Sequence, residues 1–407
     1  MKPGVEARVT AATLLTRIID EGAYSNVVIR TATRDLERRD ALFVQHLVYA
    51  TLRNLDRIDR VIDGRISRPV ESDVRSVLRV GVGEILFSDG DAYAAVDSGV
   101  EAVRALGAPK AAGFVNGVLR NVARQGEPPL PEGPEGEALR FGVPPWLFED
   151  LSEAFGDAEA KEFLDSSNQP SQVGVRHRSG AKPGNEVEGI ADAFLLEDVS
   201  QHRDEIAAGG LIISDPSSVA VVAALDPRPG DRVLDMAAAP GGKTLHLWDL
   251  MGGEGTLIAM DRHARRTSSA QRRLERLGAD VQWVIGDAVD PPFSPGSFDR
   301  ILLDAPCSGL GTLRRRPEIR HRLRPESAAV AGRIQRRMLE AAVSLLRPGG
   351  RLVYSVCTVT PEETTRVVEG TQARPPDDLA GKSFDSGILL APHITGSDGM
   401  FIAVLDR

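Results

Sequence analysis

Residues 232–244 read Arg-Val-Leu-Asp-Met-Ala-Ala-Ala-Pro-Gly-Gly-Lys-Thr. The first four predict a short buried strand that ends in an acid, and the small residues after it predict a tight turn into a helix. The glycines allow the backbone to approach a ligand closely. The turn is not a dinucleotide fingerprint, because it has no G-x-G-x-x-G. It is not a P-loop either, because Ala237 stands where that motif requires glycine.

Four further strands are predicted downstream, at residues 256–261, 281–287, 298–304 and 350–357, with helical stretches between them. This alternation is typical of a doubly wound parallel sheet. The first four of the five strands end in aspartates: Asp235, Asp261, Asp287 and Asp304. One such acid is most often a helix N-cap. Four in succession favour a ligand bound beyond the carboxyl ends of the strands.

The sequence upstream has a different pattern. Apolar residues recur at helical spacing from residue 5 to about 125, which predicts an all-α domain. Prolines, glycines and glutamates between Gly126 and Gly136 indicate a linker. We therefore expect an all-α domain at 1–126, a linker at 127–144, a small α+β region at 145–212 and an α/β domain at 213–407.

Composition narrows the class of protein. No run approaches the ~18 apolar residues of a membrane helix, and the first residues lack the apolar core of a signal peptide, so we expect a cytoplasmic protein. The formal net charge is −9, but it is segregated. Residues 312–340 hold nine arginines and three glutamates, and residues 262–276 hold six arginines and one glutamate. Such runs are usually solvated helix faces, whereas a basic cluster beside an active site favours a phosphate partner.

The two cysteines, Cys307 and Cys357, follow the fourth and fifth predicted strands, which would be neighbours in the sheet. A lone cysteine is usually a small buried hydrophobe. No nearby cysteine or histidine gives the spacing of a metal site, so we expect no metal. Two thiols beside Asp304 fit methylation of cytosine at carbon 5. A thiolate that adds to carbon 6 makes carbon 5 nucleophilic enough to accept a methyl group.

These motifs resemble those of the bacterial Sun/Fmu (RsmB-like) 5-methylcytosine methyltransferases of ribosomal RNA, over nearly the whole chain. The matching segments are residues 235–244, 304–311, 315–319, 349–358 with 361–363, and 398–401. Residues 37–53 and 111–120 look like the NusB-type RNA-binding domain of this family. The resemblance implies a Rossmann-type class I methyltransferase domain that uses S-adenosylmethionine. This chain departs from the family pattern at Ser214, Ala238, Ala239 and Val356, and none of these departures removes a catalytic atom.

The resemblance also implies the roles of individual residues. Cys357 would be the nucleophile, Cys307 would assist product release, Asp304 would hold the cytosine, and Lys243 would lie close to it and to the cofactor. Asp261 is placed to bind ribose hydroxyls and Asp287 to face the adenine amino group. The full set of candidate cofactor residues is Asp235, Ala237, Ala238, Ala239, Pro240, Gly241, Gly242, Lys243, Asp261, Arg266, Asp287, Ala288 and Asp304.

We expect the partner to be RNA, most simply ribosomal RNA. We also expect the protein to be a monomer that binds neither a membrane nor a metal. Arg314, Arg315 and Arg316 are expected to line the mouth of the catalytic crevice and to contact phosphates, and the predicted track continues at Arg39, Arg53 and Arg120. Two alternatives stay open at this point. One is transfer RNA as the substrate, and the other is a non-catalytic RNA-binding or assembly protein on a methyltransferase scaffold.

Overall fold

The computed structural model describes residues 4–407, which form two compact units. The N-terminal unit comprises residues 4–168 and 313–322, and the C-terminal unit comprises residues 169–312 and 323–407. The division at residue 168 falls inside the stretch 145–212 that the sequence assigns to one region. Residues 313–322, which the sequence assigns to the α/β domain, belong to the N-terminal unit.

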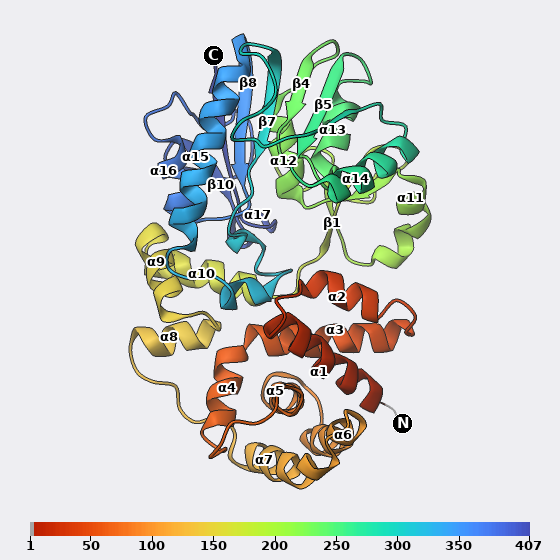
Figure 1. Cartoon of the computed structure of the whole chain (residues 1–407), viewed down its shortest axis with the longest axis vertical. Helices are drawn as coiled ribbons and strands as arrows, with labels where there is room; N and C mark the ends of the chain where they lie inside the picture. Colours follow the sequence, from red (N-terminus) through yellow and green to blue (C-terminus); the bar gives the residue numbers. More distant parts are fainter. Residues whose placement is uncertain (1–3) are drawn as a thin grey trace. The chain divides into compact units, whose positions relative to one another are not determined.

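The N-terminal unit is helical, as predicted, and residues 4–168 contain no strand. Figure 1 shows α5 end-on, with other helices around it. The helices are α1 (Val5–Ile19), α2 (Ser25–Ala32), α3 (Arg38–Arg53), α4 (Leu55–Asp63), α5 (Ser72–Phe87), α6 (Ala92–Ala105), α7 (Ala112–Gln125), α8 (Pro134–Phe141), α9 (Pro145–Phe155) and α10 (Asp157–Asn168), with short 3-10 turns at η1 (Pro109–Ala111) and η4 (Pro317–His321).

Helix α5 forms the centre of this unit because its apolar residues occur on every side. Leu78 and Val82 are fully buried, and α1, α3, α4, α6 and α7 all contact the helix. Two glycines permit the closest packing. A Cβ on Gly81 of α5 would approach Leu119 of α7 to 2.8 Å, and one on Gly99 of α6 would approach it to 2.7 Å. These three helices therefore pack more closely than larger residues would allow.

The predicted linker at 127–144 is partly wrong, because it contains helix α8. Residues 126–133 contain no helix or strand, as expected of a linker, but the helix α8 follows at Pro134–Phe141. Pro134 occupies the first turn, where its missing N–H costs nothing, and Gly142 ends the helix in the left-handed conformation with φ of 67°.

The C-terminal unit begins with a small antiparallel sheet of order β2-β1-β3. Its strands are β1 (Val173–His177), β2 (Ala193–Leu196) and β3 (Leu211–Ile213), and η2 (Val199–His202) and α11 (Arg203–Ala208) lie between the last two in the sequence. Strand β1 lies in the middle of this sheet.

The main sheet has eight strands in the order β6-β5-β4-β7-β8-β11-β10-β9. The five predicted strands are parallel, and three further antiparallel strands extend one edge, so the sheet is mixed rather than wholly parallel. The strands are β4 (Arg232–Asp235), β5 (Thr256–Asp261), β6 (Gln282–Ile285), β7 (Phe298–Asp304), β8 (Leu346–Val356), β9 (Lys382–Phe384), β10 (Gly387–Leu390) and β11 (Met400–Asp406).

Helices α12 and α15 both pack on β7 and β8, whereas α13 packs on β5 and α14 on β5 and β6. The helical elements of this part are α12 (Pro216–Leu225), α13 (Gly242–Leu250), α14 (Ala264–Arg276), η3 (Leu310–Thr312), α15 (Ser327–Leu345), η5 (Pro361–Glu363), α16 (Thr365–Val368) and α17 (Pro392–Thr395). Because β4 lies between β5 and β7, the strand order reverses beside β4, and ligand sites of open α/β sheets occur at such a point.

Candidate active site

Strands β7 and β8 bring the two cysteines together. Asp304 at the end of β7 is paired in register with Ser355 of β8, and each cysteine follows within three residues of these positions. The two Sγ atoms are 3.3 Å apart, and both cysteines are partly buried. The prediction that both thiols share one site is therefore confirmed by the geometry of the C-terminal unit.

A charged pair lies beside the thiols. Lys243 Nζ at the start of α13 donates to Asp304 Oδ2 at 2.8 Å, and Ser355 Oγ donates to Asp304 Oδ1 at 2.9 Å. Burial lowers the pKa of Lys243, but the Asp304 carboxylate, and to a smaller extent the charge of Cys357, raise this pKa above its ordinary value. Lys243 is therefore held as an ammonium ion close to both Asp304 and Cys357.

The Cys307 thiol resists ionisation. The pKa of Cys307 is raised well above its ordinary value, first by its hydrogen bond with Cys357 and then by burial and by the charges of Cys357, Glu363 and Asp304. Cys307 therefore keeps its proton at neutral pH. Only the thiolate form of a cysteine is strongly nucleophilic, so Cys307 is poorly suited to start a reaction.

Asp235 and Asp261 lie at the ends of the adjacent strands β4 and β5, as predicted, and both are buried. Asp235 Oδ2 accepts a hydrogen bond of 2.7 Å from Thr244 Oγ1. Burial is the largest influence on Asp235 and raises its pKa to about 7. Asp261 accepts hydrogen bonds from the backbone N–H groups of Ala239 at 3.2 Å and His263 at 2.8 Å. It thereby ties the loop after β4 to the end of β5.

The small residues between β4 and α13 form a compact loop. The N–H of Ala238 donates to the carbonyl of Met260 at 2.9 Å, and Gly241 has a φ of 90°. A Cβ on Gly241 would approach Leu274 of α14 to 3.0 Å, so both the backbone angle and the space favour glycine there. Arg266 of α14 donates to the carbonyl of Ala239. In the structure it therefore supports the loop.

The prediction that β6 ends in Asp287 is wrong. The strand ends at Ile285, and Asp287 is an exposed turn residue whose carboxylate accepts from the N–H of Val289 at 2.9 Å. The side chain thus forms the local turn that ends the strand. The next residue, Ala288, is buried.

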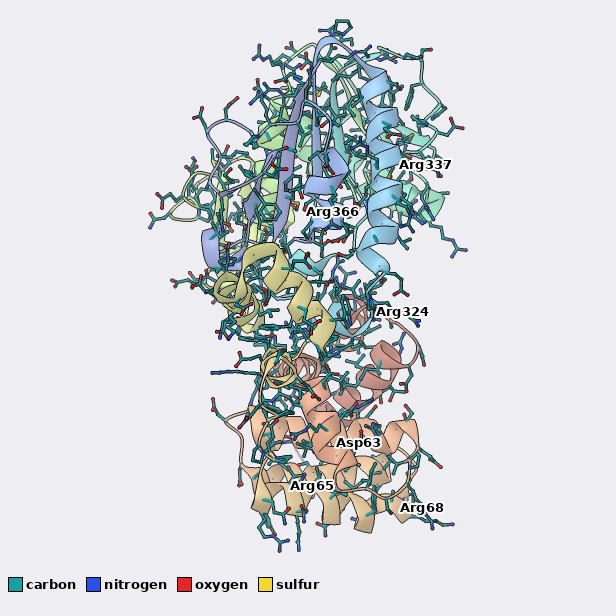
Figure 2. The ribbon with its side chains drawn as sticks, turned by 90° about the vertical axis from the view of Figure 1, so that its left-hand side faces the viewer. Asp63, Arg65, Arg68, Arg324, Arg337 and Arg366 are labelled. Carbon is teal, nitrogen blue, oxygen red and sulfur yellow. The ribbon has the colours of Figure 1, made fainter. Side chains whose placement is uncertain are left out.

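The arginines predicted to bind RNA lie in the N-terminal unit. Arg39 and Arg120 are exposed, whereas Arg53 is partly buried and donates to the carbonyl of Arg314 at 3.2 Å. Arg314, Arg315 and Arg316 are also partly buried. The arginines of the same basic run from Arg324 onward belong to the C-terminal unit. Figure 2 labels two of these exposed side chains, Arg324 and Arg337.

Sequence reasoning missed several polar residues around the thiols. Ser355 contacts Asp304, and Glu363, Gln335 and Tyr354 form a buried hydrogen-bonded network next to the cysteine loops. Two of these residues stand in stretches that match the family: Ser355 lies in Ser355-Val356-Cys357-Thr358, and Glu363 ends Pro361-Glu362-Glu363. No sequence motif marks Gln335 as a site residue, because it lies in the middle of α15.

Residues 4–407 offer neither a candidate membrane span nor a cluster of metal-binding side chains. No helix in this range is both long and apolar enough to cross a membrane. No three histidine, cysteine or acidic side chains of the described chain gather in a way that could hold a metal ion.

Comparison with known proteins places these features in a family. The family model described as 16S rRNA methyltransferase RsmB/F matches residues 222–406, and the NusB family model matches residues 5–124. The ribosomal RNA small subunit methyltransferase B of Erwinia tasmaniensis is 31% identical over all of this chain and 99% of its own length. The protein of the same name from Vibrio cholerae is 31% identical over 99% of this chain and 98% of its own.

Solved structures agree with this result. The crystal structure of PH0851 has the same fold, with a TM-score of 0.85 and 24% identity over 98% of this chain and 99% of that one. A methyltransferase homolog from Pyrococcus horikoshii matches with a TM-score of 0.57 and 27% identity, over 67% of this chain and 97% of its own. The resemblance inferred from the motifs is confirmed: the chain belongs to the RsmB/F family of S-adenosylmethionine-dependent rRNA methyltransferases and carries a NusB domain at its N-terminus.

Proposed function

We propose that this protein methylates carbon 5 of a cytosine in 16S rRNA, with S-adenosylmethionine as the methyl donor and Cys357 as the covalent nucleophile. The observation that carries the proposal is the pair of thiols 3.3 Å apart, next to the Lys243–Asp304 ion pair. Methylation of a base at a ring nitrogen or a ribose would need no second thiol at this position. The names of the relatives favour small-subunit ribosomal RNA as the substrate.

The residues present fit S-adenosylmethionine. Asp235 and Asp261 offer buried carboxylate oxygens at neighbouring strand ends, suited to a cationic ligand that also carries hydroxyl donors. The loop 237–242, Lys243, Ala288 and Asp304 complete the candidate pocket, and Arg266 would act by supporting the loop. Asp287 is the least supported member, since it is exposed and in a turn. When bound, the cofactor supplies an electrophilic methyl group on a sulfonium.

The chain's own groups would perform the remaining chemistry. The Cys357 thiolate, stabilised by the Lys243 ammonium ion, would form a bond to carbon 6 of the cytosine, and the electron pair of the 5,6 double bond would move toward carbon 5. Asp304 would accept a hydrogen bond from the cytosine amino group and hold the ring in place. After methyl transfer, the carbon 5 proton would pass to a solvent water, the 5,6 double bond would be restored, and Cys357 would leave as a thiolate. The Cys307 thiol, 3.3 Å from Cys357, would assist this release by donating a hydrogen bond to the departing thiolate.

Alanine variants of the two cysteines test the proposal. Cys357→Ala should abolish methylation and should form no protein–RNA adduct, even with RNA that carries 5-fluorocytosine, which blocks the elimination step. Cys307→Ala should still form the adduct and release it slowly, so a retarded band should persist on a denaturing gel with unmodified RNA. The opposite pattern would make Cys307 the nucleophile. Absence of the adduct in both variants would refute the division of roles.

The substrate is tested separately. Bisulfite sequencing of 16S rRNA and transfer RNA from a strain that lacks this gene should show the loss of one 5-methylcytosine in 16S rRNA. Complementation with the wild-type gene should restore the signal, whereas complementation with Cys357→Ala should not. A signal lost from transfer RNA instead would assign the enzyme to a different substrate.

A further inference from the structure

Glu363 is a fully buried carboxylate within the C-terminal unit. It accepts hydrogen bonds from Ser308 N–H at 2.8 Å, Gln335 Nε2 at 3.0 Å, Thr360 Oγ1 at 3.2 Å and Thr358 Oγ1 at 3.4 Å. These four donors are one backbone N–H and three uncharged side chains. Burial of a carboxylate without a cation is costly, so a group held in this way must be satisfied by several donors at once.

The donors come from the two loops that carry the thiols. Ser308 follows Cys307 directly, and Thr358 follows Cys357 directly. The hydroxyls of Ser308 and Thr358 are also 2.7 Å from each other. One carboxylate is therefore bonded to the residue next to each cysteine, which fixes the two loops against one another.

Contacts from α15 and β8 hold Glu363 and its partners in place. Gln335 of α15 donates from the same Nε2 atom to the carbonyl of Pro306, the residue before Cys307, at 2.9 Å. The hydroxyl of Tyr354 donates to the backbone carbonyl of Glu363 at 2.7 Å. Gly332 allows α15 to approach the turn η5, because a Cβ there would lie 2.2 Å from the carbonyl of Glu362. Gln335 of α15 thus holds the carboxylate of Glu363, and Tyr354 of β8 holds its backbone.

We propose that Glu363 is the positioning residue of the thiol pair: it holds the loops of Cys307 and Cys357 at their spacing, and its negative charge keeps Cys307 in its thiol form beside Cys357. The assignment of roles rests on the proposed function, in which Cys357 attacks the base. The raised pKa of Cys307 supports it, because the charge of Glu363 is one of its causes, after the hydrogen bond with Cys357, burial and the charge of Cys357. Glu363 touches neither substrate nor cofactor in this scheme, so it acts through the thiols.

The test uses the full-length protein without RNA. Wild type, Glu363→Gln and Glu363→Asp are treated with limiting iodoacetamide, and the alkylation of each cysteine is measured by peptide mass spectrometry. Wild type should label Cys357 in preference to Cys307. Glu363→Gln removes the charge and keeps the size of the side chain. The ratio of Cys357 to Cys307 alkylation should therefore fall by about tenfold, which corresponds to a change of roughly one unit in the difference between the two thiol pKa values. Glu363→Asp keeps the charge and should recover most of the preference.

Two further variants separate charge from geometry. Glu362→Gln is the matched control, because its side chain is paired with Arg366 and contacts neither cysteine loop, and it should behave as wild type. Gln335→Met removes the donor to Glu363 and to Pro306 but leaves the charge. It should lower kcat for RNA methylation by up to about a hundredfold with little change in KM, because displaced thiols react poorly, while Cys357 stays the preferred site of alkylation.

A wild-type labelling ratio in a folded Glu363→Gln variant would overturn the proposal. If that variant does not fold, Gln335→Met decides the positioning role, and an unchanged kcat there would also overturn it. Failure of the proposed function would look different. The labelling preference would follow the variants as expected, but neither wild type nor any variant would form the Cys357 adduct with RNA.

Discussion

Asp235 is a buried carboxyl group that accepts a hydrogen bond from the Thr244 hydroxyl and is influenced by the charges of Asp304 and Lys243. Burial favours the neutral acid, so its pKa rises from the ordinary 3.8 to about 7 in the folded protein. At neutral pH the group is therefore divided between its two forms. Small changes in its surroundings, including a bound cation, would shift this balance toward the carboxylate.

We predict that Asp235→Asn changes the pH dependence of stability. An acid whose folded pKa is raised binds its proton more tightly in the folded state, so wild type loses stability as pH rises from about 4 to about 7 and levels off above that. The rise from 3.8 to about 7 corresponds to roughly 4 kcal/mol. Relative to the variant, the wild-type free energy of unfolding should fall by on the order of this amount over that range.

Chemical denaturation at several pH values measures this difference. Asp290→Asn serves as the control, because it makes the same substitution at an exposed position outside the buried site. Parallel curves for wild type and Asp235→Asn would mean that Asp235 is an ordinary carboxylate in the folded protein.

At the scale of single elements, the basic segment after η3 packs within the N-terminal unit. Its residues Arg314–Arg316 are partly buried, and its backbone is bonded to Arg53 of α3. Packing therefore explains part of the arginine content that the sequence suggested for RNA. A partly buried guanidinium can still direct its remaining N–H groups at a phosphate, so the RNA role stays a prediction.

We predict that the triple variant Arg314→Gln, Arg315→Gln, Arg316→Gln weakens RNA binding and reduces its salt dependence. Each phosphate contact that is lost should flatten the plot of log K against log salt concentration by about 0.7 for single-stranded RNA. The affinity for S-adenosylmethionine, measured by calorimetry, should not change. An unchanged salt slope would leave these arginines with a purely structural role.

The elements also show how far the sequence alone could lead. Strands β4, β5 and β7 were predicted to the residue, because buried parallel strands are short apolar runs with clear ends. The antiparallel edge strands β9 and β10 are short and interrupted by Asp385 and Ser386, so they gave no periodic signal. The thiol pair was predictable from the order of neighbouring strands. The Glu363 network was not, because its partner Gln335 is distant in the sequence and only the fold brings it close.

At the scale of the whole molecule, the chain leaves the C-terminal unit after Thr312 and returns to it at Leu323. The residues between are firmly held within the N-terminal unit. The buried Glu318 accepts from Ser25 N–H at 3.1 Å and from Ser25 Oγ at 2.7 Å. Arg320 is fully buried and donates to the carbonyl of Phe141 at 2.9 Å. The N-terminal unit is therefore complete only when it includes residues that follow the Cys307 loop in the sequence.

We predict that Ser25→Ala loosens this segment specifically. The substitution removes a hydroxyl donor from a buried carboxylate, which should destabilise the N-terminal unit by about 1–3 kcal/mol. Hydrogen exchange of residues 313–322 should become faster, while exchange in β4, β5 and β7 stays as in wild type, because those strands draw none of their bonds from Ser25. Ser88→Ala, which removes a hydroxyl bonded to the exposed His46, is the matched control and should leave residues 313–322 protected. Equal exchange in both variants would mean that the Glu318–Ser25 bonds do not hold the segment. Faster exchange that spreads into β7 would mean that this anchor also stabilises the strand that leads to Cys307.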